Sequence, residues 1–252
     1  MKGLIPVLVF FILVPVFCAG QKVGGFPVIE GLDTRGFKER VAWVPERVEC
    51  RYLYIGKLQD SIRVGNDLSP YWNSKIMSDY LCYESDSVDR RLSALGYWEW
   101  TKLEVLVDTT QRILVKKERG FTIDKYYLAY PVLIVNQNSI PVNIGVPEYL
   151  DLSVEARDLD GHWKTLARPF NFFCLSGASM VHLPPGEVVL GNALIFSGAT
   201  MTSLRVRFGN SVSESFWGSV NLGQLTDSAP FNYFYDGRAW SYPELASRHF
   251  YW

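Results

Sequence analysis

The clearest pattern in the chain is an alternation of apolar and polar residues that begins near Trp98 and continues to about residue 220. A period of two is typical of strands, whereas a helix that buries one face repeats every 3.6 residues. The alternation is cleanest at 103–108 and 150–156. The pattern predicts strands at 103–108, 111–115, 126–135, 150–156, 162–166, 188–196, 204–208 and 213–220.

The segment at 126–135 (YYLAYPVLIV) differs because it is apolar at nearly every position. Such a run predicts a central strand that is covered on both faces. Pro131 complicates this prediction, since proline cannot donate a hydrogen bond to a neighbouring strand and favours a sheet edge or a bulge.

Turn residues between the strands indicate the fold class. Asp158–Gly161 predicts a hairpin turn, and 184–186 (Pro-Pro-Gly) occupies another turn position. Eight to ten short strands without crossover helices favour antiparallel pairing over a parallel α/β fold. We therefore expect a mainly β chain with an antiparallel immunoglobulin-like β-sandwich at 101–227.

Residues 21–100 are less regular. Residues 21–48 predict an irregular lead-in, and strands at 51–55 and 61–64 predict a hairpin. The segment 70–95 is the one stretch with a helical pattern, and it predicts a short helix near its end. We expect this N-terminal part to pack on the sandwich.

Residues 1–20 have the features of a signal peptide. Lys2 gives a positive start, residues 4–17 form a short apolar run, and small residues permit cleavage before Gln21. The alternative is a lipid-modified Cys18, which the large side chain of the preceding residue disfavours.

No later segment is apolar for 18 residues, so we expect no transmembrane span in the mature chain. The sequence predicts an exported protein, located in the periplasm, at the outer-membrane surface or outside the cell.

Composition narrows the class of partner. The 252 residues are 48% hydrophobic and 20% charged, which is typical of one folded globular unit. Lys and Arg number 25 and Asp and Glu 26, so the chain lacks the excess of positive charge that attracts nucleic acids. We expect no nucleic-acid partner.

Three cysteines follow the signal peptide: Cys50, Cys82 and Cys174. In an oxidising compartment an odd number permits one bridge and one thiol, or no bridge. If any two of them pair, we expect the bridge to join Cys50 and Cys82, and we expect Cys174 to be a buried thiol. The wide spacing excludes a C-x-x-C zinc site.

The runs at 127–136, 152–164 and 204–221 resemble uncharacterised exported immunoglobulin-like β-sandwich proteins of Gram-negative bacteria. The likeness covers roughly residues 100–225. Its motifs are strands and turns, so the resemblance implies a fold and an export route and assigns no active-site residue.

The sequence contains no convincing catalytic set. Asp108-Thr109-Thr110 lacks the glycine and the second copy of an aspartic-protease loop, so it predicts a turn. No G-x-S-x-G elbow accompanies the histidines. Cys174 is expected to pack as a small apolar residue, although a thiol pair with His182 is the alternative. The sequence does not support an enzymatic function, and we expect no catalytic residue and no cofactor.

A metal site is also not expected. His162, His182 and Asp160 are the conceivable ligands, and Asp158 adds a second carboxylate at a spacing that calcium loops use. The further ligands of such a loop are missing, so the carboxylates predict an Asx turn in a hairpin.

Aromatic residues give the remaining candidates for binding. On a strand, Trp98 and Trp100 would face one side, and with Trp163 they could form a platform for a sugar ring. Core packing is the ordinary alternative. Glu99 would point away from the indoles, so the pair of flanking carboxylates of a glycosidase is not indicated.

Residues 228–252 form an aromatic-rich tail with nine Phe, Tyr and Trp residues among 25. Exposed aromatic residues on this scale would form an adhesive surface. We expect the tail either to pack on a flank of the sandwich or to dock on a partner.

Two functions from different classes follow. The first is a non-catalytic cell-envelope protein that acts in protein–protein interaction or assembly. The second is a carbohydrate-binding module, or a glycan-acting enzyme, that uses exposed Trp and Tyr. Exposure of Trp98, Trp100 and Trp163 on one flat face would favour the second.

Overall fold

The computed structural model describes residues 25–31, 33–40, 50, 52–64, 81–82, 103–117, 125–146, 149–150, 152–167 and 180–225. In these residues the chain is mainly β, and η2 (Leu222–Gln224) is the one short helix. All pairs in the larger sheets are antiparallel, so the expected mainly β class with antiparallel sheets is confirmed.

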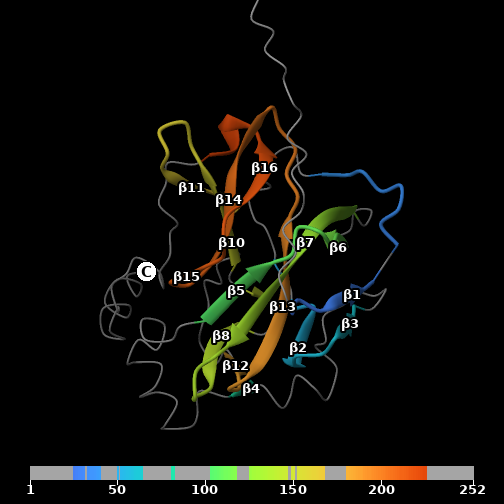
Figure 1. Cartoon of the computed structure of the whole chain (residues 1–252), viewed down its shortest axis with the longest axis vertical. Coiled ribbons are helices and arrows are strands. Elements are labelled where there is room, and N and C mark those ends of the chain that lie inside the picture. The colour runs from blue at the N-terminus through green and yellow to red at the C-terminus, as the bar shows by residue number, and fades with distance from the viewer. Residues whose placement is uncertain are drawn as a thin grey trace, which may run out of the picture.

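One large sheet is built on two long central strands, β7 and β13, and is called the β7–β13 sheet (Figure 1). Both strands are rich in Val, Leu and Ile, which suit a surface covered on two sides. The strand order is β2 (Tyr54–Lys57), β13 (Glu187–Leu194), β7 (Lys125–Asn136), and then β5 (Leu103–Val107) and β6 (Ile113–Lys117), which share the far edge of β7.

The other large sheet is called the β10–β14 sheet. In the second half of its central strand β14, from Leu204 onward, buried residues alternate with partly exposed ones. The strand order is β11 (Trp163–Ala167), β10 (Leu152–Arg157), β14 (Thr200–Phe208), and then β15 (Ser211–Val212) and β16 (Phe216–Val220), which share the far edge of β14.

The described residues also form two smaller sheets. One has the order β4 (Leu81–Cys82), β12 (Met180–Leu183), β8 (Val142–Val146) and β9 (Tyr149–Leu150). The other is a parallel pair of β1 (Val28–Glu30) and β3 (Ser61–Arg63).

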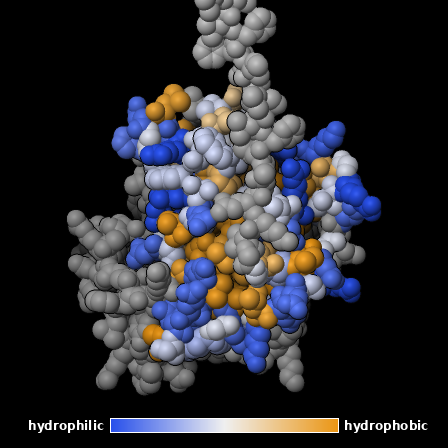
Figure 2. All heavy atoms as spheres, in the orientation of Figure 1, coloured by the Kyte–Doolittle hydropathy of each residue, from blue (hydrophilic) through white to orange (hydrophobic). Residues whose placement is uncertain are grey.

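The two large sheets contact each other through a common apolar core. The rings of Tyr130 in β7 and Phe216 in β16 meet edge to face, with centroids 5.7 Å apart. Gly191 of β13 leaves room for neighbouring leucines, because a Cβ there would lie 2.6 Å from Leu150 Cδ2 and 3.0 Å from Leu152 Cδ1 and would displace them. On the side seen in Figure 2, apolar residues gather at the centre, over β5, β7 and β13, with hydrophilic residues around them.

The predicted central strand at 126–135 is confirmed, and Pro131 lies inside it rather than at a sheet edge or a bulge. It pairs with Asn192 of β13 on one side. On the other side β5 ends opposite Val132 and β6 begins opposite Ala129, so neither strand has a residue paired with Pro131. The missing N–H of proline therefore falls at the gap between β5 and β6, where its cost is small.

A buried amide joins β7 to the neighbouring small sheet. Asn136 is 0% exposed, and its Nδ2 donates to the carbonyls of Ile140 and Leu183 at 2.9 and 2.8 Å. Its Oδ1 accepts the N–H of Asn138, and its backbone carbonyl accepts the N–H of Gly186. Asn136 thus fixes both the turn after β7 and the turn between β12 and β13.

The predicted hairpin turn at Asp158–Gly161 and the predicted turn at Pro184–Gly186 are both confirmed. The N–H of Gly161 donates to the carbonyl of Asp158, and Gly161 has a φ of 85°, a conformation that glycine adopts without strain. At the Pro184–Gly186 turn the N–H of Glu187 donates to Pro184, and Gly186 has a φ of 72°.

The N-terminal hairpin prediction is wrong. The strands at 51–55 and 61–64 do not form a hairpin, because β2 pairs with β13 and β3 pairs with β1. The edge of β13 gives β2 a wide sheet to join, whereas an isolated hairpin is only marginally stable. The irregular lead-in contains β1, and Leu81–Cys82, inside the predicted helical segment, forms β4.

The signal peptide at 1–20, the helix expected near residue 90 and the tail at 228–252 lie outside the described residues, so these remain predictions. Within the residues that are described, no helix is both long and apolar enough to cross a membrane.

Candidate functional site

The candidate site is the side of the β10–β14 sheet that points away from the β7–β13 sheet. Residues directly opposite each other in antiparallel strands project to the same face. Arg157 lies opposite Trp163, and Glu155 lies opposite Arg205. The buried residues on the inward side are Leu152, Val154, Ala156, Leu204, Val206, Phe208, Phe216 and Val220. The opposite side, called the outward face, consists of Ser153, Glu155, Arg157, Trp163, Thr165, Met201, Ser203, Arg205, Arg207, Trp217 and Ser219.

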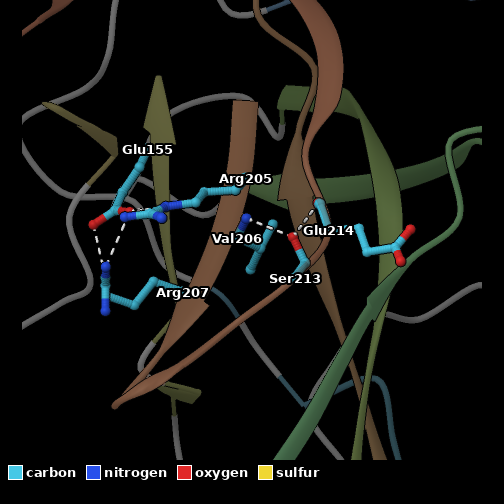
Figure 3. A network of polar contacts seen from close by, with 6 residues as sticks. All are labelled: Glu155, Arg205, Val206, Arg207, Ser213 and Glu214. Atoms are coloured by element: carbon cyan, nitrogen blue, oxygen red, sulfur yellow. Dashed lines mark hydrogen bonds and ion pairs between the residues drawn. The ribbon is translucent and has the colours of Figure 1, made fainter. Parts of the chain in front are cut away.

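An ion cluster occupies the middle of the outward face. Oε2 of Glu155 accepts a hydrogen bond from Nε of Arg205 at 2.5 Å, and Oε1 accepts one from Nε of Arg207 at 2.7 Å. The side chains are 11%, 18% and 29% exposed for Glu155, Arg205 and Arg207. Figure 3 shows the three side chains meeting on one side of the ribbon, away from Ser213 and Glu214. One carboxylate therefore holds two guanidinium groups that project from the same strand.

The charge of Glu155 is stabilised by this cluster. Burial disfavours the ionised carboxylate, but the hydrogen bonds from Arg207 and Arg205 outweigh that penalty. The pKa of Glu155 is therefore lowered from its ordinary value of 4.5.

Trp163 contacts the same cluster. The guanidinium carbon of Arg205 lies 4.2 Å from the centroid of the Trp163 ring, a cation–π contact. A bulge between Val154 and Glu155 in the pairing of β10 with β11 shifts the register on this side of the sheet. The result is a fixed layer in which the indole, the guanidinium group and the carboxylate hold one another.

Exposed apolar side chains surround the ion cluster. Trp217 is 59% exposed and Met201 56%, both on the outward face, and Leu159 in the β10–β11 turn is 79% exposed. Val212 in β15 adds a fourth at 41%. Among the described residues the remaining large exposed apolar side chains are Val28, Leu58 and Ile140, so four of seven belong to this sheet and its turn.

Ser213 determines where β16 begins. Its Oγ accepts the N–H of Val206 at 2.9 Å and donates to the carbonyl of Glu214 at 2.8 Å, as Figure 3 shows. The hydroxyl thus accepts a hydrogen bond from a backbone N–H of β14 at the break between β15 and β16. This break allows β16 to pair along the first half of β14 and to present Trp217 outward.

Sequence reasoning identified part of this site. Trp163 is on the outward face and half-buried, while Trp98 and Trp100 lie outside the described residues. Trp217, Arg205 and their partners were missed. Polar residues at alternate positions of an apolar strand, as in Leu204-Arg-Val-Arg207, were the available signal.

The predicted pair of Cys50 and Cys82 is not present in the structure. Cys50 is a buried thiol whose Sγ lies 3.3 Å from both the backbone N and O of Asn192. Its carbonyl accepts the N–H of Leu150 in β9, whereas Cys82 is in β4, at the opposite edge of the same four-stranded sheet. Three strand spacings, about 14 Å, separate those edges, and a disulfide needs Cα atoms within about 7 Å. Cys174 lies outside the described residues.

The carboxylates named as conceivable metal ligands form the expected Asx turn. Oδ1 of Asp158 accepts the N–H groups of Asp160 and His162 at 3.0 and 2.7 Å. Ligand atoms of Asp158, Asp160 and His162 lie within 4.8 Å of one another, but the turn accounts for this proximity. His182 is in β12 and does not belong to this group.

Asp108 also has a structural role, as its turn motif predicted. Its Oδ1 accepts the N–H and hydroxyl of Thr110, and its Oδ2 accepts Nε2 of Gln111. Gln111 in turn binds the N-terminal segment, because Oε1 accepts the N–H of Ile29 and Nε2 donates to the carbonyl of Pro27. The N-terminal strand is thereby held on the turn between β5 and β6.

Comparisons with protein-family models, with curated proteins and with solved structures each give no match for this chain.

Proposed function

We propose that this protein is an exported, non-catalytic β-sandwich protein of the cell envelope that acts in protein–protein interaction or assembly. The observation that carries the proposal is the outward face of the β10–β14 sheet. It combines exposed Trp217 and Met201 with three arginines. Trp, Met and Arg are enriched in protein interfaces, and Trp and Arg contribute most of their binding energy.

The immunoglobulin-like part of the proposal is supported by strand order. In chain order, β5, β7 and β13 of one sheet take the places of strands A, B and E of such sandwiches, and β10, β14 and β16 of the other sheet take the places of strands C, F and G. The export part is supported by the apolar run at 4–17 and the cleavage motif before Gln21.

Carbohydrate binding is the second candidate, and one observation favours it. Trp217 presents an exposed indole on a sheet face, as sugar-stacking residues do. Trp163 contributes less to such a platform, since Arg205 already lies over its ring.

Capture of partners after chemical crosslinking in the native envelope tests the proposal. The tagged full-length chain is compared with Trp217→Ala and with Val28→Ala, a control at a residue of equal exposure, 59%. We expect a protein partner that Trp217→Ala loses and Val28→Ala keeps. Absence of any protein partner, together with binding to purified envelope glycans, would reject the proposal in favour of the second candidate.

A further inference from the structure

We propose that the outward face of the β10–β14 sheet docks an acidic segment of a partner protein, whose apolar side chains cover Trp217 and Met201. This inference rests on the proposed function and names the chemistry of the partner at that same site.

The charge of the outward face points to an acidic partner. Its strand positions carry three guanidinium groups, on Arg157, Arg205 and Arg207, and one carboxylate, on Glu155. The carboxylate accepts the Nε–H of Arg205 and both the Nε–H and an Nη2–H of Arg207, and each guanidinium group has further N–H donors. Asp158 lies beyond the end of β10, and its Oδ1 is occupied by N–H groups of its own turn. Carboxylates of a partner would therefore complement the positive charge of the arginines on these strands.

The same charge argues against a second copy of this chain as the occupant. A symmetric dimer through this face would bring two arginine-rich surfaces together, because a two-fold interface pairs a patch with itself. Like charges at close range disfavour that arrangement.

The apolar residues indicate a protein rather than an ion or a sugar. Ser203 lies opposite Trp217, and Arg157 lies opposite Trp163, so the two tryptophans are on outer strands of one face. Three strand spacings place them about 14 Å apart. Leu159 and Met201 extend the apolar surface at the same end of the sheet. An extended segment with alternating acidic and apolar residues matches both parts of the face.

Site-specific photocrosslinking in the native envelope identifies the occupant. The photoreactive amino acid p-benzoylphenylalanine replaces Trp217 or Met201 in the full-length chain, and Val28 as the control position of equal exposure to Trp217. We expect positions 217 and 201 to capture the same protein and position 28 not to capture it. Mass spectrometry of the joined peptides should show a partner segment of net negative charge.

Affinity for the purified partner then tests the chemistry. We expect Trp217→Ala to weaken binding about thirtyfold, as a central anchor does. We expect Arg157→Gln to weaken it about two- to fivefold, with a reduced dependence on salt. Arg63→Gln, at an arginine with an 85% exposed side chain in β3, should leave affinity unchanged. Thermal melting of each variant confirms that it folds.

The outcomes separate the two proposals. Protein captured at position 28 but not at 217 or 201 would leave the proposed function intact and reject this face. Adducts from 217 or 201 to a second copy, to residues 226–252 of the same chain, to lipid or to glycan would each overturn the acidic partner. So would an affinity that neither Arg157→Gln nor salt alters. No protein adduct at any position would overturn both proposals.

Discussion

The two large sheets use the same secondary structure in opposite ways. In the β7–β13 sheet the successive residues Val132, Leu133 and Ile134 point to alternate faces, yet all are 0–1% exposed. In the β10–β14 sheet burial alternates along β14, with Val206 at 0% between Arg205 and Arg207 on the outward face. The central strands of the first sheet are therefore covered on both sides and support the fold, while the second sheet has one side available for contacts.

Polar residues show the same difference. Asn136 at the end of β7 is completely buried, and its amide groups bond to backbone atoms of two turns. Glu155 in β10 bonds to side chains of a neighbouring strand and keeps part of its surface exposed. The buried polar group of the first sheet therefore forms hydrogen bonds to the backbone, whereas the cluster of the second sheet fixes the positions of side chains on a surface.

The largest expected effect is in the covered sheet. Leu133→Ala should lower the free energy of unfolding by about 2–5 kcal/mol, because it leaves a cavity at a residue that is 1% exposed. Urea denaturation at neutral pH measures this. The matched control is Met201→Ala on the outward face, expected to change stability by less than about 0.5 kcal/mol. Equal losses in the two variants would contradict the distinction between the sheets.

Removing the buried amide should cost slightly less. Asn136→Ala leaves the carbonyls of Ile140 and Leu183 without their donor, which should destabilise the protein by about 2–3 kcal/mol. The adjacent Gln137→Ala is the control, since its side chain bonds to Glu104 at an exposed position. If both variants unfold at the same urea concentration as the parent, Asn136 does not hold the two turns.

The ion cluster should contribute less again. Glu155→Gln removes the charge that holds Arg205 and Arg207, and we expect a loss of about 1–2 kcal/mol after allowing for solvent at the arginines. Asp33→Asn, which alters a solvent-exposed pair with Arg35, should leave stability unchanged. A Glu155→Gln protein as stable as the parent would show that the cluster only decorates the surface.

Acid should reproduce the effect of Glu155→Gln. Because the pKa of Glu155 is lower in the folded state, its stabilisation is present above the unfolded pKa and is lost as pH falls through the folded pKa. The stability difference between the parent and Glu155→Gln should therefore shrink as pH falls below about 4.5. A difference that is constant across this range would contradict the lowered pKa.

The smallest expected effect on stability is on the outward face. Trp217→Ala should change the melting temperature little, since an exposed side chain away from caps and turns rarely alters stability by more than about 0.5 kcal/mol. It should nevertheless abolish capture of the partner protein. A large loss of stability would show that Trp217 is part of the core of the folded chain.

Much of the β fold could be predicted because its signals are local. The alternation at 103–108 and 150–156, and the turn at Asp158–Gly161, depend on neighbouring residues alone. The hairpin expected around Gly56 was wrong for the opposite reason. β2 pairs with β13, which is more than 130 residues away, and nothing near residue 55 encodes that choice.

The candidate site divides in the same way. Trp163 was identified because it is an aromatic residue in a recognisable strand. Arg205 and Arg207 were not identified, because the sequence does not distinguish an arginine in an ion cluster from an ordinary surface arginine until its partner is known. The partner is Glu155, about 50 residues earlier, and only strand pairing brings it opposite Arg205.

The sequence by itself determined that this chain is mainly β, where most of its strands of residues 101–227 lie, and where two of its turns bend. Tertiary structure decided which strands pair, why Pro131 fits a central strand, and that the buried thiol of Cys50 lies against the backbone of Asn192. The physical reason is the range of the forces. Hydrophobic period and turn conformation act within a few residues, whereas strand register depends on burying the right faces across the whole core.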